Sequence, residues 1–236
     1  MSPDPQALDM LRESAADVVA RSTDLKRLRE RRGTLPGFDP AQLQQMAELG
    51  WLGILVPEAR GGLGLGLTEM ATVLQELGKG LMADPLPPLA LATRVLCHAP
   101  GWAGTAEALA RVVEGHRLPI VAWQEGLGGI DPAAITTRAQ PSGNGWRLNG
   151  GKRFVAGAAA AAGFIVSARV DEGAALFWVD ADAPGLRLDH EWRADQTPSG
   201  LLVLQDVHVT PAQRIAADLG PLARALDEAA VLASAE

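Results

Sequence analysis

A glycine-rich stretch in the middle of the chain holds the residue types best suited to binding a ligand. Residues 124–131 read Gln-Glu-Gly-Leu-Gly-Gly-Ile-Asp, and they follow the apolar run 118–123, which predicts a strand. Glycines at a strand end expose backbone N–H groups and let a ligand approach the backbone closely. Gln124 adds an amide that can donate and accept hydrogen bonds. Taken without its neighbours, the stretch is more simply an ordinary glycine turn.

A second candidate segment carries an aromatic residue near a lysine. Residues 152–156 read Lys-Arg-Phe-Val-Ala, in a region predicted to be strand. The flat apolar ring of Phe154 can cover one face of a planar ligand by offset contact. The alternative is that Phe154 is a core residue of the strand. Paired-carboxylate, zinc and P-loop signatures are absent from the sequence, and its four histidines are scattered, so no metal site is predicted.

The first ~115 residues are predicted to be helical. Apolar positions recur at helical spacing from residue 8, so one helix is expected from the N-terminus to Gly33 and Pro36. Asp39 and Gly50 are typical cap residues at the two ends of the next helix. Thr68 is expected to cap a later one. The remaining expectations are an apolar strand or extended run at 51–57, a loop at 61–66, and helices at 68–77, 88–97 and 103–114.

The pattern changes to short strands after Gly115. Strands are expected at 118–123, 133–139, 145–148, 153–155, 163–169, 174–179 and 201–204, separated by turn signals at 141–145, 149–150, 171–173 and 183–185. Residues 156–163 are expected to form a loop or one helical turn. Many short strands at this spacing favour a sandwich or barrel. After Pro211 the chain is expected to return to helix, in a run from Pro221 that has no stop signal, which indicates either truncation or docking onto another subunit.

Composition excludes several classes of protein. The chain has 236 residues, a net charge of −7 and no basic stripe, which argues against a nucleic-acid partner. The Lys/Arg cluster at 26–32 is interpreted as the solvated end of a helix rather than a phosphate or partner site. Cys97 is the one cysteine, which fits a reducing compartment and, in its apolar surroundings, an inert side chain. No run reaches the length of a membrane span, and no signal peptide is evident, so a cytoplasmic location is expected.

Two further segments strengthen the pattern. Residues 46–58 with Gly61-Gly62, and then residues 73–80, precede the strand region in that order. Together with residues 124–131 and 152–156, they make nearly all of the chain resemble the acyl-CoA dehydrogenase family. The resemblance implies an α+β fold, in which an all-helical domain precedes a small antiparallel β-sandwich or barrel and the first helix of a C-terminal bundle. The implied boundaries are 1–116, 117–212 and 213–236.

The resemblance also implies an FAD site and an acyl-CoA site. It assigns cofactor binding to Gln124, Gly126, Gly129, Thr137, Phe154, Val155 and Ala156, and substrate binding to Ile130. Four of these depart from the family pattern, which usually has threonine, serine, tryptophan and a hydroxyl residue at positions 124, 130, 154 and 156. The backbone N–H of Ala156 could still serve where the hydroxyl is missing. The departures are similar to those of branches that act on bulky or unusual acyl groups.

The implied activity is FAD-dependent α,β-dehydrogenation of an acyl-CoA, with a separate electron acceptor. The family takes its catalytic glutamate from the C-terminal bundle, so no catalytic residue is assigned within 1–236, and Glu125 lies on the wrong side of the flavin for that role. The expected assembly is a homodimer, a homotetramer or a pair with a paralogous subunit. A non-catalytic partner subunit of a heteromeric enzyme is the alternative. A third interpretation is an interaction protein that binds no flavin.

Overall fold

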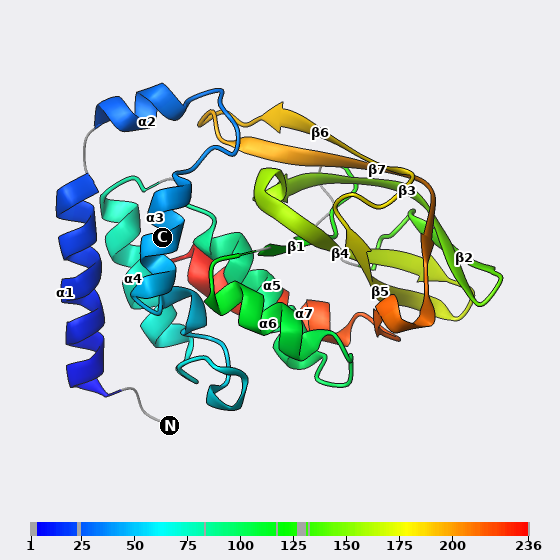
Figure 1. Cartoon of the computed structure of the whole chain (residues 1–236), viewed down its shortest axis with the longest axis horizontal. Coiled ribbons are helices and arrows are strands. Elements are labelled where there is room, and N and C mark those ends of the chain that lie inside the picture. The colour runs from blue at the N-terminus through cyan, green and yellow to red at the C-terminus, as the bar shows by residue number, and fades with distance from the viewer. Residues whose placement is uncertain are drawn as a thin grey trace.

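The computed structural model describes residues 4–22, 25–82, 84–116, 118–126, 131 and 133–235. A helical layer lies on one side of the molecule and a strongly curved sheet on the other, and the last helix returns to the helical side (Figure 1). The predicted fold class, helical domain followed by sheet domain and final helix, is therefore confirmed. No helix within the described ranges has the length and hydropathy to span a membrane.

Among the described residues, six helices of the helical layer precede the sheet. They are α1 (Pro5–Ser22), α2 (Leu25–Arg31), α3 (Pro40–Glu48), α4 (Leu67–Lys79), α5 (Leu86–His98) and α6 (Thr105–Val113), with 3-10 turns at Trp51–Gly53 and Glu58–Arg60. The expectation of one helix up to Gly33 is wrong, because the chain forms α1 and α2 separately. Ala15 and Val18 bury α1 against α4. The sequence of α2 is mostly charged, so the apolar face that α1 presents through Ala15 and Val18 does not continue into α2.

Cap chemistry sets the ends of α3 and α4. The Asp39 carboxylate accepts a hydrogen bond of 3.0 Å from the Ala41 amide, as predicted, and Gly50 follows α3 with a left-handed φ of 79°. The predicted cap at Thr68 is wrong. α4 begins one residue earlier, after Gly66, whose amide donates to the Glu69 carboxylate at 2.9 Å. A glutamate that reaches back in this way satisfies an amide at the helix start without a hydroxyl cap.

The apolar run at 51–57 is not a strand. It begins with the 3-10 turn Trp51–Gly53 and continues as a buried turn. The amides of Leu63 and Leu65 donate to the carbonyls of Gly53 and Ile54, so the loop that follows pairs with the run. Burial explains why the run is apolar, and the local pairing satisfies its backbone without a sheet.

The sheet is mixed, with the order β6-β7-β3-β2-β4-β5-β8 and β1 paired to β4. Its strands are β1 (Leu118–Ala122), β2 (Arg138–Ser142), β3 (Gly145–Ala156), β4 (Ala161–Val170), β5 (Gly173–Asp180), β6 (Leu186–Trp192), β7 (Pro198–Val209) and β8 (Arg214–Ala216). Most neighbours are antiparallel, as expected. The β1–β4 pair is parallel, and β1 is buried at all five residues because it lies between the sheet and the helices.

Several strand expectations need correction. The segments 145–148 and 153–155 belong to one strand, β3, and the predicted turn at residues 149–150 is a bulge inside it. Gly150 has a φ of 147°, and a Cβ there would lie 2.6 Å from the Thr137 hydroxyl oxygen. Glycine is therefore needed at this position for close packing of β3 against Thr137, and not for a reversal of the chain. β2 begins at Arg138, later than expected. Of the two alternatives for residues 156–163, a loop or one helical turn, the structure has a helical turn at residues 158–160. β6 went unpredicted because its residues are largely polar and only partly buried.

The chain after β7 does not become helical at once. A 3-10 turn at Pro211–Gln213 and the short strand β8 precede α7 (Gly220–Ala233). α7 packs on α5, where Leu222 and Ala225 share a buried cluster with Ala92 and Leu96. At the edge of this contact Arg94 donates to Glu228 through Nε at 2.6 Å and Nη2 at 2.8 Å, and His98 lies 3.1 Å from the same carboxylate.

Candidate functional site

The two segments singled out in the sequence meet in space. The Arg153 amide, in β3, donates a hydrogen bond of 2.8 Å to the carbonyl of Gln124, which follows β1. The strand end that carries Phe154 therefore lies beside the start of the glycine-rich stretch. Gln124 is half-buried, and a Cβ added to Gly126 would meet nothing within 4 Å. The Gly126 backbone therefore borders open space.

A buried ion pair joins the two segments. Lys152 is fully buried, and its Nζ donates to Glu125 Oε1 at 2.6 Å, to Ser167 Oγ at 3.0 Å and to the Trp123 carbonyl at 3.4 Å. The Glu125 side chain, 11% exposed, also accepts hydrogen bonds from the amides of Thr136 and Thr137. Every donor of the ammonium group thus has an acceptor, which is the condition under which a buried charge is tolerated.

The charges of this pair are set by burial and by the contacts together. Burial alone would raise the pKa of Glu125, but hydrogen bonds from Lys152 and Thr136, with the lysine charge, outweigh it and hold the pKa at about 2. Burial lowers the pKa of Lys152 to about 8, against the opposing effect of Glu125. Both groups are ionised at neutral pH. Glu125 is therefore a fixed structural anion and not a proton acceptor.

Thr137 is held inside the protein. Its side chain is fully buried, and its hydroxyl donates to the Gly151 carbonyl at 3.3 Å. The Thr137 amide binds Glu125 at 3.1 Å. The close approach of Gly150 to Thr137 completes the packing. In this structure Thr137 fixes the glycine-rich segment against β3, and its hydroxyl is already engaged.

The three residues at the end of β3 have different surroundings. Phe154 is half-buried and has a left-handed φ of 57°. The Arg153 guanidinium lies 5.3 Å from its ring centroid and is also paired to Glu191 at 2.5 Å. The Val155 side chain is 2% exposed and belongs to the core. Ala156 lines a cavity. Gly129 and Ile130 lie outside the described residues.

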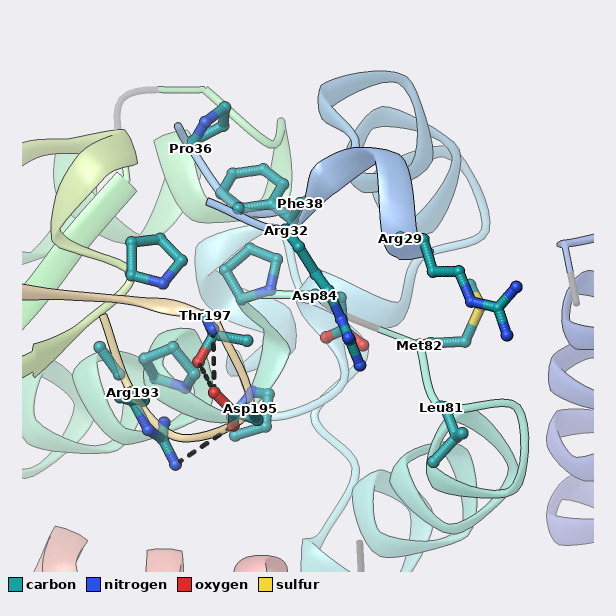
Figure 2. Close-up of a pocket in the computed structure, with 17 residues that line it drawn as sticks. Arg29, Arg32, Pro36, Phe38, Leu81, Met82, Asp84, Arg193, Asp195 and Thr197 are labelled. Carbon is teal, nitrogen blue, oxygen red and sulfur yellow. Dashed lines mark hydrogen bonds and ion pairs between the residues drawn. The ribbon is translucent and has the colours of Figure 1, made fainter. Parts of the chain in front are cut away.

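That cavity lies between the helical layer and the sheet and has a volume of about 660 Å³. Ala156 and Gly157 contribute to it from β3, and the turn between β6 and β7 contributes Arg193, Asp195 and Thr197. Figure 2 shows this turn on one side and Arg29 and Arg32, from the α2 region, on the other. The size is typical of a pocket that encloses a small organic ligand. The sequence did not single out the arginines as pocket residues, because only the tertiary fold brings them to it.

Comparison with known proteins identifies the family. Residues 5–116 match the acyl-CoA dehydrogenase N-terminal domain, and residues 121–207 match the acyl-CoA dehydrogenase middle domain. The chain belongs to the acyl-CoA dehydrogenase family. Benzylmalonyl-CoA dehydrogenase of Aromatoleum aromaticum is 31% identical over 159 residues, which cover 65% of this chain and 42% of that protein. The chain spans less than half the length of the curated relatives it matches.

Solved structures of the family share the fold. A variant of the Tcur3481-Tcur3483 steroid ACAD is 33% identical, with a TM-score of 0.86 over 98% of this chain and 62% of that one. The ChsE4-ChsE5 complex from Mycobacterium tuberculosis is 27% identical, with a TM-score of 0.77 over 100% of this chain and 62% of that one. Both of these solved structures carry a paired name, Tcur3481-Tcur3483 and ChsE4-ChsE5.

The pocket contains two carboxylates, Asp84 and Asp195. Asp84 accepts a hydrogen bond of 2.7 Å from the Leu86 amide. Asp195 accepts from the hydroxyl and amide of Thr197 at 2.7 and 2.9 Å, and these bonds lower its pKa. Both carboxylates serve to shape turns. Within the described part of the chain, no cluster of three or more His, Cys, Asp or Glu residues could hold a metal ion.

Proposed function

We propose that this chain supplies the flavin-binding and acyl-binding surfaces of an FAD-dependent acyl-CoA dehydrogenase. The observation that carries the proposal is the contact of the glycine-rich segment with β3, whose end contributes Ala156 and the following Gly157 to a pocket between the helices and the sheet. Family membership supports FAD as the cofactor. When bound, FAD accepts the hydride that leaves the acyl group in α,β-dehydrogenation.

The residues present fit a flavin. Gly126 has open space where the side chain of another residue would lie. The Phe154 ring is half-buried, and the small Ala156 side chain leaves room at the wall of the pocket. We assign the Gln124 side chain and the Ala156 amide as hydrogen-bond donors to the ring system, and the Phe154 ring as an apolar contact to its face. The Glu125–Lys152 pair and Thr137 hold these groups in place. Val155 supports the site from the core.

The chemistry assigned to this part of the protein is binding and orientation. A carboxylate must remove the α-proton of the acyl group. Asp84 and Asp195 are committed to hydrogen bonds that shape their turns, and Glu125 is committed to Lys152. We therefore propose that the base is supplied from outside the described residues. A second copy or a paralogous subunit would complete the site, and a separate electron acceptor would reoxidise the flavin.

A second candidate is a non-catalytic partner subunit of a heteromeric acyl-CoA dehydrogenase. The similarity to the ChsE4-ChsE5 complex and to the Tcur3481-Tcur3483 protein favours it, as does the absence of an uncommitted carboxylate among the described pocket residues. In this role the chain would complete a shared flavin site or stabilise its partner without turning over substrate itself.

The test is to produce the longest open reading frame that contains this chain, alone and together with any paralogue encoded beside it. Retention of FAD, measured by the visible flavin absorption band, is expected in one of these forms. Anaerobic addition of an acyl-CoA should then bleach that band. Bleaching by the protein alone supports the complete enzyme, and bleaching only with the paralogue supports the partner subunit. A colourless protein in both forms, after reconstitution with free FAD, refutes the proposal.

A further inference from the structure

A second, smaller pocket lies between the start of α6, the start of β4 and the end of β5. We call it the tryptophan pocket, because Trp102 and Trp178 line it together with Asp180, Glu107 and Arg111. It shares no lining residue with the larger pocket described above. Its volume of about 200 Å³ is below the range typical of cofactor sites, and it suits one functional group with a short apolar stem.

Both indole N–H groups in this pocket are already engaged by the protein. Trp178 and Asp180 point to the same side of β5, because residues two apart on a strand share a face, and Trp178 Nε1 donates to Asp180 Oδ1 at 2.8 Å. Trp102 Nε1 donates to the Ala212 carbonyl at 2.8 Å. The ring centroids are 5.8 Å apart and the ring planes are tilted by 30°. The two rings therefore offer a ligand their aromatic surface rather than a hydrogen-bond donor.

The positions of the two rings depend on glycines beneath them. A Cβ added to Gly163, on β4, would lie 2.2 Å from Trp178 Cζ2, and one added to Gly104 would lie 2.5 Å from Trp102 Cζ2. Both distances are too short for any side chain, so each ring packs directly on backbone. The rings are thus held by a hydrogen bond and by a close backbone contact, which makes them a preformed wall.

The charge of the pocket is carried by Asp180. Glu107 and Arg111, one turn apart on α6, form an ion pair with each other. Two carboxylates and one guanidinium leave the lining with a net charge of −1. Asp180 uses Oδ1 for Trp178, and among the residues that the structure describes its Oδ2 has no hydrogen-bond or ion-pair partner. A cation is attracted both to the face of an indole and to a carboxylate.

We propose that the tryptophan pocket binds one organic cation, an alkylammonium or guanidinium group, which pairs with Asp180 and packs its stem against Trp102 and Trp178. The inference does not depend on the proposed function, because none of these residues belongs to the candidate flavin site. Free amines and the lysine or arginine side chains of a partner protein share this chemistry. The volume of the pocket admits one such group and excludes a larger ligand.

The experiment uses the protein from the longest open reading frame that contains this chain, labelled with 5-fluorotryptophan. The ¹⁹F resonances of Trp102 and Trp178 are assigned from the W102F and W178F variants. Butylammonium and butylguanidinium are the cationic probes, and 1-butanol is the neutral probe with as many heavy atoms as butylammonium. Nα-acetyllysine methylamide then distinguishes a protein side chain, which it resembles, from a free amine.

The critical variant is D180N, because the asparagine oxygen can still accept from Trp178 Nε1 while the charge is removed. Its matched control is D182N. Asp182 lies two residues further along, is exposed and does not line the pocket, so that both variants change the net charge equally.

The expected result is a saturable shift of the Trp102 and Trp178 resonances by at least one cationic probe, with a Kd of about 1 mM, the value for one cation–π contact and one charge-assisted contact. D180N should raise this Kd roughly fivefold or more, and D182N should leave it unchanged. Binding of the lysine derivative assigns the site to a protein side chain, and its exclusion assigns the site to a free amine.

Three results would overturn the inference. The first is the absence of a saturable shift with both cationic probes. The second is equal affinity for 1-butanol and butylammonium, which would make the pocket an apolar site without selectivity for charge. The third is an equal effect of D180N and D182N, since the cation would then respond to the net charge of the protein and not to Asp180.

Discussion

Replacing Lys152 by methionine tests whether the buried ion pair holds the glycine-rich segment against β3. The substitution keeps an unbranched side chain of similar length but leaves Glu125, Ser167 Oγ and the Trp123 carbonyl without their shared donor. Removing one partner of a buried pair costs about 3 kcal/mol or more, because the other charge stays buried. For a chain of this length, each kcal/mol lowers the melting temperature by ~2–4 °C, so K152M should lower it by ~6–12 °C.

Lys79 provides the control. It is paired to Glu76 at the same nitrogen–oxygen distance, 2.6 Å, but its side chain is 61% exposed whereas that of Lys152 is fully buried. K79M should cost only a few tenths of a kcal/mol, about the value of an exposed helical pair. Thermal unfolding followed by tryptophan fluorescence measures both variants. The reasoning is refuted if K152M and K79M shift the melting temperature equally.

A double-mutant cycle with Glu125→Gln gives a second check. E125Q/K152M should be more stable than the sum of the single effects by ~1 kcal/mol or more, since the double variant buries no charge. The pH dependence follows from the lowered pKa of Glu125. Its stabilising contribution is fully present above pH about 4.5 and is lost as the pH falls toward about 2, and E125Q should remove that part of the acid transition. Additive single effects would contradict the pairing.

Three further predictions concern the site and the contact between helices. F154A should weaken FAD binding roughly three- to tenfold, since it removes an aromatic contact, and the flavin retained on purification measures this. G150A should destabilise the protein by more than ~2 kcal/mol, measured by urea unfolding, because the new Cβ would lie 2.6–2.9 Å from Thr137 atoms at a φ of 147°. E228A should cost ~2 kcal/mol in the same assay, because it leaves the partly buried Arg94 guanidinium without its carboxylate.

G101A is the control for G150A, and R224A is the control for E228A. G101A places its Cβ where no atom lies within 4 Å and where φ is not left-handed, so it should be nearly neutral. Unchanged flavin content in F154A would remove Phe154 from the site. R224A, on the solvent side of α7, should have little effect, and an E228A variant as stable as R224A would show that the Arg94 contact is unimportant.

The sequence predicted correctly those helix ends that depend on a few adjacent residues. Asp39 and Gly50 mark the ends of α3 because caps depend on a few adjacent residues. The apolar run at 51–57 was misjudged because burial gives the same composition to a strand and to a compact turn. β6 was missed because its largely polar, half-buried sequence offers no clear strand pattern.

In the candidate site, too, contacts between residues far apart in the sequence could not be predicted. The sequence indicated which segments carry Gln124 and Phe154, but not the contacts that hold them together. Glu125 and Lys152 are 27 positions apart, and only strand register brings them to 2.6 Å. Arg29 and Arg32 resemble the solvated end of a helix in sequence. Their place at the pocket depends on how α2 and the β6–β7 turn meet, which no local pattern records.

The return of α7 to α5 means that the helical layer is discontinuous in sequence. The whole sheet is inserted between two helices that share one buried cluster, in which Leu222 lies with Leu96. The sheet must therefore bring its two ends, which connect to α6 and to α7, close together before α7 can dock on α5. Closing so long a loop costs conformational entropy, and this cost grows only slowly with the length of the loop. We therefore expect residues 4–116 to be less stable alone than in the whole chain, since without α7 the apolar face of α5 would be exposed to water.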